Sequence, residues 1–499
     1  MAATKTKHRV SLSIDRRSTL SDQRKVSNNS FSSKGKSFSD KPTPTDFDLF
    51  LPWICKEMQV PNSVIVLTMA QEKYPKASCG SASSKSKSSI KTNRTFKLKH
   101  DDFSSNKKLS VTTATSGVKN VNYVPITAYY DTSGRLVEIA IIGCTVDIPK
   151  QVIQAISFCF PFHSLFAKLE IRKGGLHSAL LNEIGKMLPY SNLVDVCLDD
   201  TRVPQGNYYV LLDKASHLKH LSVSKCNITD EICKKIFSRL KFGCPAEKSV
   251  MILNLSMNRI TDDGANFIGD VLRGNRNMLH LNLAGNNITD IGLGNILRSL
   301  LEFPLTYDEI IESKTRYLKY CKNRLYVYNK CLEEVTEMTR TEELLAKHDG
   351  SPSKHTKFRD RKKEERRKTI VETESVVSKA EKLTNKMLGE FYDPFCANNV
   401  IKRNNYLYSI GNLKLCSLNL SYNKLEFISL VKILKVLCYQ NSLTMKPPNT
   451  GLMHIVLEGN LLPQSCRELD SIKMFLSNVV KARAPVHLRS PTMKKRTSN

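Results

Sequence analysis

The amino-acid sequence predicts an α/β solenoid, a horseshoe arc with a parallel sheet on its inner face and helices on its outer face. Three observations lead to this prediction. The pattern L-x-x-L-x-L-x-x-N-x-I recurs along the chain, the first six copies begin 25–32 residues apart, and 40% of the 499 residues are hydrophobic, which suffices for a sizeable core. Repeats of this length are typical of units that contribute one strand and one full helix.

Eight copies of the pattern occur, and the strand and turn of each unit follow from it. They begin at residues 136, 166, 193, 218, 250, 278, 415 and 452. Apolar residues at the fourth and sixth positions alternate with other residues, which predicts a short strand with one buried face. Asparagine at the ninth position is expected to turn the chain and to bond backbone groups of neighbouring units. It is present as Asn258, Asn286, Asn423 and Asn460, and Cys226 is a weaker substitute.

Helices are expected after the turns. Thr261 and Thr289 are N-cap residues, each followed by an acidic residue that suits the first turn of a helix. Apolar spacing then predicts which side chains face the core. These are Ala265, Phe267, Ile268, Val271 and Leu272 in the fifth unit, and Ile291, Leu293, Ile296, Leu297 and Leu300 in the sixth.

The strand and turn residues resemble the ribonuclease-inhibitor type of leucine-rich repeat over about 136–302 and 414–480. This resemblance implies an α/β horseshoe that acts as a non-catalytic scaffold for protein partners. The order of the segments, including 304–312 and 451–466, is also similar to one family of such proteins without assigned catalysis. That similarity implies a ciliary, axonemal or sperm-flagellar component that is associated with microtubules.

Charge divides the chain into five segments. Residues 1–120 (+13) form a basic, serine-rich region that is expected to be mostly disordered apart from an apolar island at 46–70. Repeats 1–6 occupy 121–302 (+2), a charged insertion occupies 303–413 (+5), repeats 7–8 and a cap occupy 414–480 (+3), and 481–499 (+6) is a basic tail. Most of the net charge of +29 therefore lies outside the repeats, which suggests that the flanks contact a polyanion.

Two segments outside the repeats allow more than one interpretation. The island at 46–70 is either an element packed on the end of the main domain or a docking motif for a partner. The run at 359–368 mixes acidic and basic residues, and it is a nuclear or nucleic-acid-binding signal, a microtubule contact, or a solvated segment.

The insertion contains a heptad-like pattern that predicts a helix over 309–339. Ile311, Leu318, Leu325 and Leu332 recur at intervals of seven residues, and Cys321, Tyr328 and Val335 follow the last three of them by three residues. Three alternatives remain open: a helix folded against its own insertion or the horseshoe edge, a coiled-coil partner helix, or a solvated single helix.

The third and fifth positions of each unit point away from the core and form the expected concave, partner-binding face. The candidate contact residues are Lys168, Asp195, His220, Asn254, His280, Asn282, Asn419 and His454. A metal shared by the histidines is not expected, because His220 and His280 lie two strands, roughly 9–10 Å, apart. The alternatives are a ridge that contacts a partner and ordinary solvated positions.

The sequence contains no pattern for catalysis or for a cofactor. G-x-x-x-x-G-K-[ST], H-E-x-x-H, G-x-S-x-G and EF-hand loops are absent, and Arg202 and Arg259 offer only a remote analogy to GTPase activators. Fourteen cysteines without a C-x-x-C pair, and the lack of an apolar run of about 18 residues, indicate a reduced, non-membrane environment. The expected partner is an unidentified protein, with microtubule or axonemal proteins preferred over nucleic acid. The expected location is the cytoplasm, a cilium or a flagellum, with the nucleus as the alternative.

Overall fold

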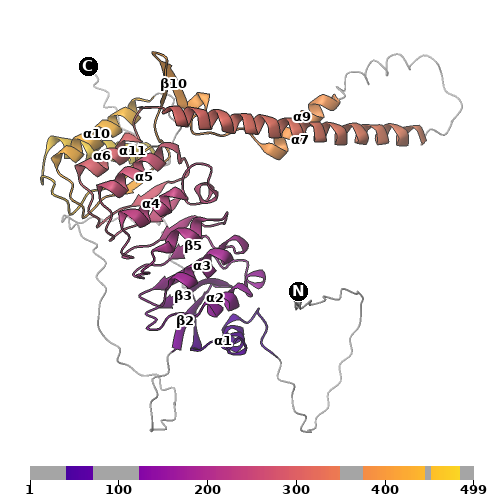
Figure 1. The fold of residues 1–499 in the computed structure, drawn as a ribbon, viewed down its shortest axis with the longest axis vertical. Helices are drawn as coiled ribbons and strands as arrows, with labels where there is room; N and C mark the ends of the chain where they lie inside the picture. Colours follow the sequence, from indigo (N-terminus) through magenta and orange to yellow (C-terminus); the bar gives the residue numbers. More distant parts are fainter. Residues whose placement is uncertain (1–40, 71–122, 349–374, 444–450, 484–499) are drawn as a thin grey trace, which may run out of the picture. The chain divides into compact units, whose positions relative to one another are not determined.

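A computed structural model describes residues 41–70, 123–348, 375–443 and 451–483. Its main feature is one sheet of ten strands (Figure 1). In sheet order the strands are β1 (Ser63–Ala70), β2 (Tyr123–Tyr130), β3 (Leu136–Ile142), β4 (Lys168–Arg172), β5 (Asp195–Cys197), β6 (His220–Ser222), β7 (Ile252–Asn254), β8 (His280–Asn282), β12 (Ser417–Asn419) and β13 (His454–Val456). The strands from β3 onward are parallel and correspond to the eight predicted units. The predicted α/β solenoid is confirmed.

Helices follow the strands of the units and pack against their neighbours in chain order, as Figure 1 shows for α4, α5 and α6. They are α2 (Lys150–Ser157), α3 (Ser178–Met187), α4 (Asp230–Ser238), α5 (Asp262–Gly274), α6 (Asp290–Arg298), α10 (Phe427–Ser442) and α11 (Arg467–Arg483). Short 3₁₀ turns supplement them at η1 (Phe160–Phe162), η2 (Leu188–Tyr190) and η4 (Pro245–Lys248), and a further one, η5 (Ala397–Asn399), lies in the insertion. The third unit, which is the shortest, replaces its α-helix with the 3₁₀ helix η3 (Asn207–Leu212).

The expected helix caps and core residues agree with the structure except at one position. The Thr261 hydroxyl accepts a hydrogen bond from the Asp263 backbone, and the Thr289 hydroxyl accepts one from Ile291. The other expected core residues of α5 and of the sixth unit are buried or partly buried. Ile291 is the exception, because 69% of its side chain is exposed. It stands in the first turn of α6 on the outward side, so its prediction as a core residue was wrong.

The N-terminal end of the sheet is closed by elements outside the repeat pattern. The apolar island forms α1 (Phe47–Glu57) and β1, and Phe47, Phe50, Leu51 and Cys55 are buried in the main core. β1 runs parallel to β2, whereas β2 pairs antiparallel with β3. The island is therefore an element packed on the end of the main domain, and its buried residues are not a docking motif. The rest of the predicted disordered region, at 1–40 and 71–122, lies outside the described residues.

The ninth-position asparagines form a buried ladder between units. Asn258 accepts hydrogen bonds from the backbone N–H groups of Cys226 and Ile228 (both 3.0 Å) and donates to the carbonyls of Val223 (3.0 Å) and Leu255 (2.9 Å). Asn286, Asn423 and Asn460 make the same kinds of contact further along. Each side chain satisfies backbone groups that would otherwise be buried without partners.

Cys226 continues the ladder in a weaker form. Its thiol donates to the carbonyls of Leu198 (3.1 Å) and Ser224 (3.3 Å), but it lacks the amide oxygen with which asparagine accepts backbone N–H groups. The Thr201 hydroxyl also donates to the Leu198 carbonyl. The substitution predicted at Cys226 thus keeps only the donor half of the asparagine contact.

The eighth position of every unit has a left-handed backbone, which the sequence template does not reveal. The residues are Gly143, Lys173, Asp200, Lys225, Met257, Gly285, Tyr422 and Gly459, with φ between 55° and 74°. The side chains of Met257 and Tyr422 lie over Gly285 and Gly459 of the next unit, where an added Cβ would collide with them. In the last four units a large side chain therefore alternates with glycine at this turn, and the large side chains, Met257 and Tyr422, are exposed.

The insertion leaves the solenoid without interrupting its sheet, because β8 pairs directly with β12. It contains α7 (Tyr307–His348), α9 (Val376–Leu388) and a small antiparallel sheet of β9 (Phe303–Pro304), β10 (Val400–Arg403) and β11 (Tyr406–Ser409). Glu309 near the start of α7 forms a two-pronged ion pair with Arg273 of α5, with both N–O distances at 2.8 Å. This contact fixes the root of the insertion to the fifth unit.

The helix α7 is longer than the predicted 309–339, and only one of the two predicted heptad rows faces its packed side. It packs on α9, where Cys331, Val335, Ala380 and Thr384 are buried. In contrast, Ile311, Leu318 and Leu325 of the heptad row are 44%, 60% and 61% exposed. The insertion therefore folds on itself through the side of α7 that carries Val335, the last residue of the second predicted row, and not through the row of Ile311, Leu318 and Leu325. The mixed-charge run at 359–368 and the tail from 484 lie outside the described residues.

The reactivity of buried cysteines tests whether the chain is packed around them as described. Burial raises the pKa of the Cys55 and Cys197 thiols to about 11, although Arg172 partly opposes this effect at Cys197. At pH 8 roughly one such thiol in a thousand is ionised, and access is blocked as well. We expect iodoacetamide at pH 8 to modify the exposed Cys438 while Cys55 and Cys197 stay protected until the chain unfolds, as measured by peptide mass spectrometry. Equal rates at Cys55 and Cys438 would contradict this core.

Candidate partner-binding surface

The predicted contact residues lie on the sheet face opposite the helices, hereafter the open face. Strand register aligns the third positions in a first row: Glu138, Lys168, Asp195, His220, Ile252, His280, Ser417 and His454. The fifth positions form a second row: Ala140, Glu170, Cys197, Ser222, Asn254, Asn282, Asn419 and Val456. All eight predicted residues therefore fall on one surface, but their environments differ.

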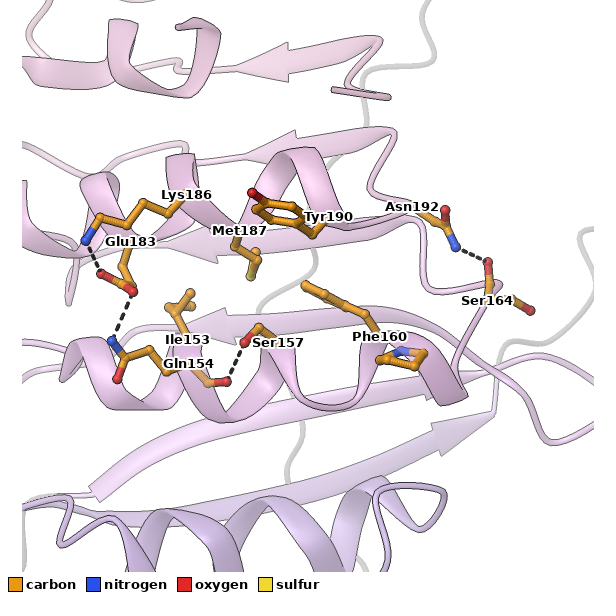
Figure 2. A pocket seen from close by; sticks show the side chains of 11 residues that line it. Ile153, Gln154, Ser157, Phe160, Ser164, Glu183, Lys186, Met187, Tyr190 and Asn192 are labelled. Atoms are coloured by element: carbon orange, nitrogen blue, oxygen red, sulfur yellow. Dashed lines mark hydrogen bonds and ion pairs between the residues drawn. The ribbon is translucent and has the colours of Figure 1, made fainter. Parts of the chain in front are cut away.

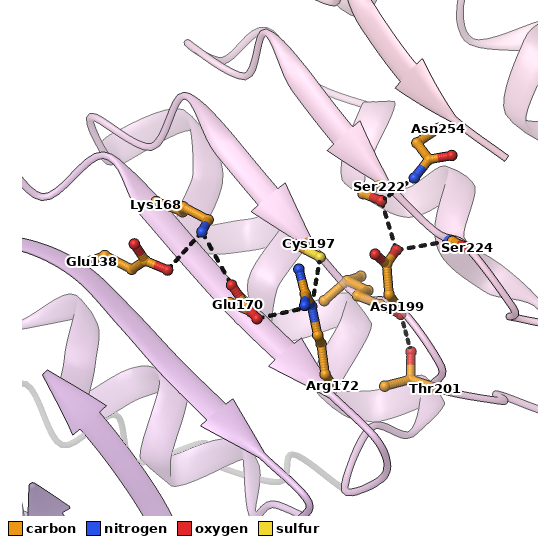
Figure 3. Close-up of polar contacts among 11 residues, drawn as sticks. Glu138, Lys168, Glu170, Arg172, Cys197, Asp199, Thr201, Ser222, Ser224 and Asn254 are labelled. Atoms are coloured by element: carbon orange, nitrogen blue, oxygen red, sulfur yellow. Dashed lines mark hydrogen bonds and ion pairs between the residues drawn. The ribbon is translucent and has the colours of Figure 1, made fainter. Parts of the chain in front are cut away.

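At the N-terminal end of the open face, charged side chains satisfy one another (Figure 3). Lys168 Nζ lies 2.7 Å from Glu138 and 3.1 Å from Glu170, and Glu170 also accepts from Arg172 at 2.8 Å. Burial alone would lower the pKa of Lys168, but the hydrogen bonds from the two carboxylates outweigh it and raise the pKa. Lys168 is thus engaged within the sheet, which makes it a poor contact residue despite its predicted role.

The middle of the open face is also internally paired. His220 Nδ1 lies 3.1 Å from Asp195, and the Asp199 carboxylate accepts from the Ser222 hydroxyl (2.6 Å) and the Ser224 backbone (2.8 Å). Asn254 donates to Ser222 at 2.9 Å, which extends this chain of contacts across three units (Figure 3). His220 and Asn254 therefore bond within the sheet, and Asp195 does so through one carboxylate oxygen while its buried Oδ1 has no partner among the described residues.

The C-terminal part of the open face is different, because its side chains are more exposed and less paired. Ile252, His280 and His454 are exposed, and His454 contacts only the neighbouring Ser417 hydroxyl (3.1 Å) among the described residues. The Asn282 and Asn419 amide oxygens each accept one backbone N–H from their own turn. Their NH₂ groups have no acceptor within the described part of the chain, so they can donate to a ligand.

Apolar side chains that the prediction did not include complete this region. Ile252 is 37% exposed in the first row, and Met257 and Tyr422 project from left-handed turns at the ends of β7 and β12. The one sequence feature that could have revealed such a residue is an apolar side chain at an outward strand position, and among these three residues only Ile252 has it. Exposed aromatic and apolar groups beside unpaired donors are typical of protein interfaces.

A separate hollow of about 490 Å³ lies between α2 and α3 (Figure 2). Phe160, Met187 and the exposed ring of Tyr190 form its apolar part. At its rim Glu183 accepts from Gln154 (3.0 Å) and Lys186 (3.1 Å), and the Gln154 hydrogen bond lowers the pKa of this carboxylate. Glu183 is satisfied by these bonds, and no histidine, cysteine or aspartate lines the hollow, so it offers no pair for acid–base chemistry.

Comparison with known proteins supports the repeat interpretation. The family model described as Leucine Rich repeat matches residues 214–237, 248–269 and 274–297, which contain β6, β7 and β8 and most of the helix that follows each strand. The fold is a leucine-rich-repeat solenoid. The comparison with curated proteins returns no match. Leucine-rich repeats are in general non-catalytic modules that bind protein partners, so the open face is the natural candidate for the functional surface.

The described residues of this solenoid were also checked for membrane-spanning helices and for metal-binding groups. No described helix combines the length and apolar character that spanning a membrane requires. Within the same residues, no group of three or more His, Cys, Asp or Glu side chains is arranged to hold a metal ion. Arg202 and Arg259 are exposed after their strands, and no other feature marks either of them.

Proposed function

We propose that this protein is a non-catalytic adaptor that holds a protein partner on the C-terminal part of its open face. The observation that carries the proposal is a contrast along one sheet. From β3 to β6 most polar side chains of the open face form ion pairs or hydrogen bonds with one another, and Asn254 of β7 joins them. In contrast, Ile252 of β7 and His280 are exposed, and Asn282 and Asn419 keep unused NH₂ donors. Binding of a partner to this region breaks few hydrogen bonds within the sheet. The complex gains both buried apolar surface and new hydrogen bonds.

The finer assignment rests on resemblance. The units with full helices favour the ribonuclease-inhibitor type of repeat. The order of repeats, charged insertion and resumed repeats resembles leucine-rich repeat-containing protein seventy-one, and this supports a ciliary or axonemal adaptor in the cytoplasm or flagellum. The basic segments 1–120 and 481–499 then suit contact with the acidic surface of microtubules. A nuclear protein whose flanks contact nucleic acid is the alternative.

Substitutions on the open face test the first part of the proposal. Ile252→Asp with His280→Asp should abolish co-purification of a partner that binds wild-type protein, because it places two charges in the apolar contact. Arg298→Asp on the exposed side of α6 is the control, and it should leave the partner bound. If the double variant retained the partner at the wild-type ratio in quantitative mass spectrometry, this surface would not be the binding site.

Salt-titrated co-sedimentation tests the role of the flanks. The full chain is compared with a variant lacking 1–40 and 484–499, because a deletion up to 120 would also remove α1 and β1 from the core. Binding to microtubules that weakens with salt, with loss of the flanks and with removal of the acidic tubulin tails supports the axonemal adaptor. Preference for duplex DNA at matched charge supports the nuclear alternative.

A further inference from the structure

The junction between the insertion and the repeats contains a second surface feature, a pocket of about 790 Å³, hereafter the junction pocket. The repeat body contributes Phe242, Arg276 and Lys414, and the insertion contributes Lys319 and Tyr392. Aromatic contacts bring these two sources together: Phe242 and Tyr392 have ring centroids 6.2 Å apart, and Arg316 of α7 stacks over Phe242 at 5.0 Å. The pocket is therefore a built part of the junction.

Arg276 is the unusual group in this pocket. It is only 8% exposed, and its guanidinium donates to two neutral acceptors, the Leu272 carbonyl (3.0 Å) and the Ser409 hydroxyl (3.4 Å). Among the described residues no carboxylate forms an ion pair with it, since the nearby Glu309 is held by Arg273. A buried guanidinium without a counter-ion is costly, and it has unused N–H donors for an anion.

Arg276 remains positively charged at neutral pH and therefore still lacks a counter-ion. Burial lowers the pKa of Arg276 to about 10, which still leaves the side chain protonated near pH 7. The other arginine of the pocket, Arg316, already has a counter-ion, because its Nε lies 2.7 Å from the fully buried carboxylate of Asp393. An anion from solution would therefore be directed to Arg276.

The rest of the lining favours a polyanion over a single carboxylate. Lys319 and Lys414 are exposed and form no ion pair in the described part of the chain, and Lys248 also lines the pocket. Two carboxylates oppose them: Glu247, whose pKa burial raises, and Glu390. A phosphate carries close to two charges and three acceptor oxygens, so it can bond the arginine and a lysine together.

The shape and the rings indicate a small molecule with a flat base. None of the lining residues belongs to a strand, so a peptide would find no backbone ladder there. The volume is that of a small-molecule site. Tyr392 is 55% exposed and, with Phe242, offers a surface against which a base can stack.

We propose that the junction pocket binds a nucleotide, with its phosphates on Arg276, Lys319 and Lys414 and its base against Tyr392 and Phe242. Because the ligand contacts both the repeats and the insertion, it also fastens one to the other. This site is separate from the open face, so its failure would leave the proposed adaptor function untouched.

Titration of the full chain with fluorescent mant-ATP in magnesium-free buffer tests the proposal. Lys319→Gln combined with Lys414→Gln should weaken binding by about tenfold or more, since two charge-assisted contacts are lost. Lys322→Gln, an exposed change on the same helix outside the pocket, is the matched control and should bind as wild type. Absence of saturable binding by wild-type protein, or equal binding by the double variant, overturns the proposal.

Two further variants separate the phosphate contact from the base contact. Tyr392→Leu should weaken ATP but leave competition by pyrophosphate unchanged, and equal effects on both ligands would overturn the assignment of the base. Arg276→Gln should abolish binding of both ligands. Because Arg276 is buried, the substitution could unfold the protein, so the thermal unfolding of the Arg276→Gln variant is measured in the same experiment. Binding retained in a folded Arg276→Gln protein overturns the site.

Discussion

Replacing Asn286 by alanine should lower the free energy of unfolding by roughly 3–5 kcal/mol. The Asn286 amide accepts from the Ile260 backbone (3.0 Å) and donates to the carbonyls of Leu255 (3.1 Å) and Leu283 (2.9 Å). Alanine leaves these buried groups without partners, and each unpaired group costs about 1–3 kcal/mol. The affected groups belong to two neighbouring units, so the loss weakens the contact on which a solenoid depends. Chemical denaturation followed by circular dichroism measures the shift.

Asn282→Ala is the matched control for this result. Asn282 lies four residues earlier in the same unit, is half-buried, and accepts only from the Ala284 backbone (3.1 Å) in its own turn. Its removal should cost less than about 1 kcal/mol, because water can reach the freed N–H. Equal destabilisation by the two substitutions would show that the ladder does not hold the units together.

Phe47→Ala should destabilise the protein by about 3–5 kcal/mol. Phe47 is fully buried in the core, and its ring packs edge-on against His163 with centroids 6.2 Å apart. Truncation removes apolar contact and leaves a cavity between α1 and the first repeats. We expect hydrogen exchange to rise in α1 and β1, because these elements close the N-terminal end of the sheet.

Leu49→Ala on the same helix provides the comparison. Its side chain is 64% exposed, so the change should stay within about 0.5 kcal/mol. A large effect of Leu49→Ala together with a small effect of Phe47→Ala would mean that α1 packs through its other face. That outcome would return the island at 46–70 to the docking-motif hypothesis.

The sequence was sufficient to place the repeated strands and their turns. An alternation of apolar residues with a period of two leaves one register in which every unit buries the same positions, which is why the two rows of the open face were predictable. The ninth-position asparagine has a fixed hydrogen-bonding task, so its role at Asn258 and Asn286 could also be read from its spacing.

Other features depend on contacts between segments that are distant in the chain. The exposure of Leu318 and Leu325 follows from α9 covering a different face of α7, which no heptad pattern reveals. β1 and β2 carry no repeat signature, and their place in the sheet follows from the pairing of β2 with β3 and of β1 with β2. No sequence pattern marks Arg276, because insertion residues distant in the chain, including Ser409, lie beside it.

The open face also shows what an outward strand position leaves undetermined. Lys168, Asp195 and His220 were predicted as contact residues from their third positions, and each bonds a neighbour across the strands. Pairing along the sheet depends on which side chains the neighbouring units present, so it becomes visible only once the register is known. The same register leaves Ile252 and His280 open.

Site-specific photo-crosslinking tests the central claim, that the C-terminal part of the open face holds a protein partner. A benzophenone side chain is placed at His280, and in a second protein at the exposed outer position Ile291. We expect a discrete adduct of one partner from position 280, its loss when Ile252→Asp is added, and no such adduct from position 291. An adduct that forms from position 291 and not from position 280 would contradict the account.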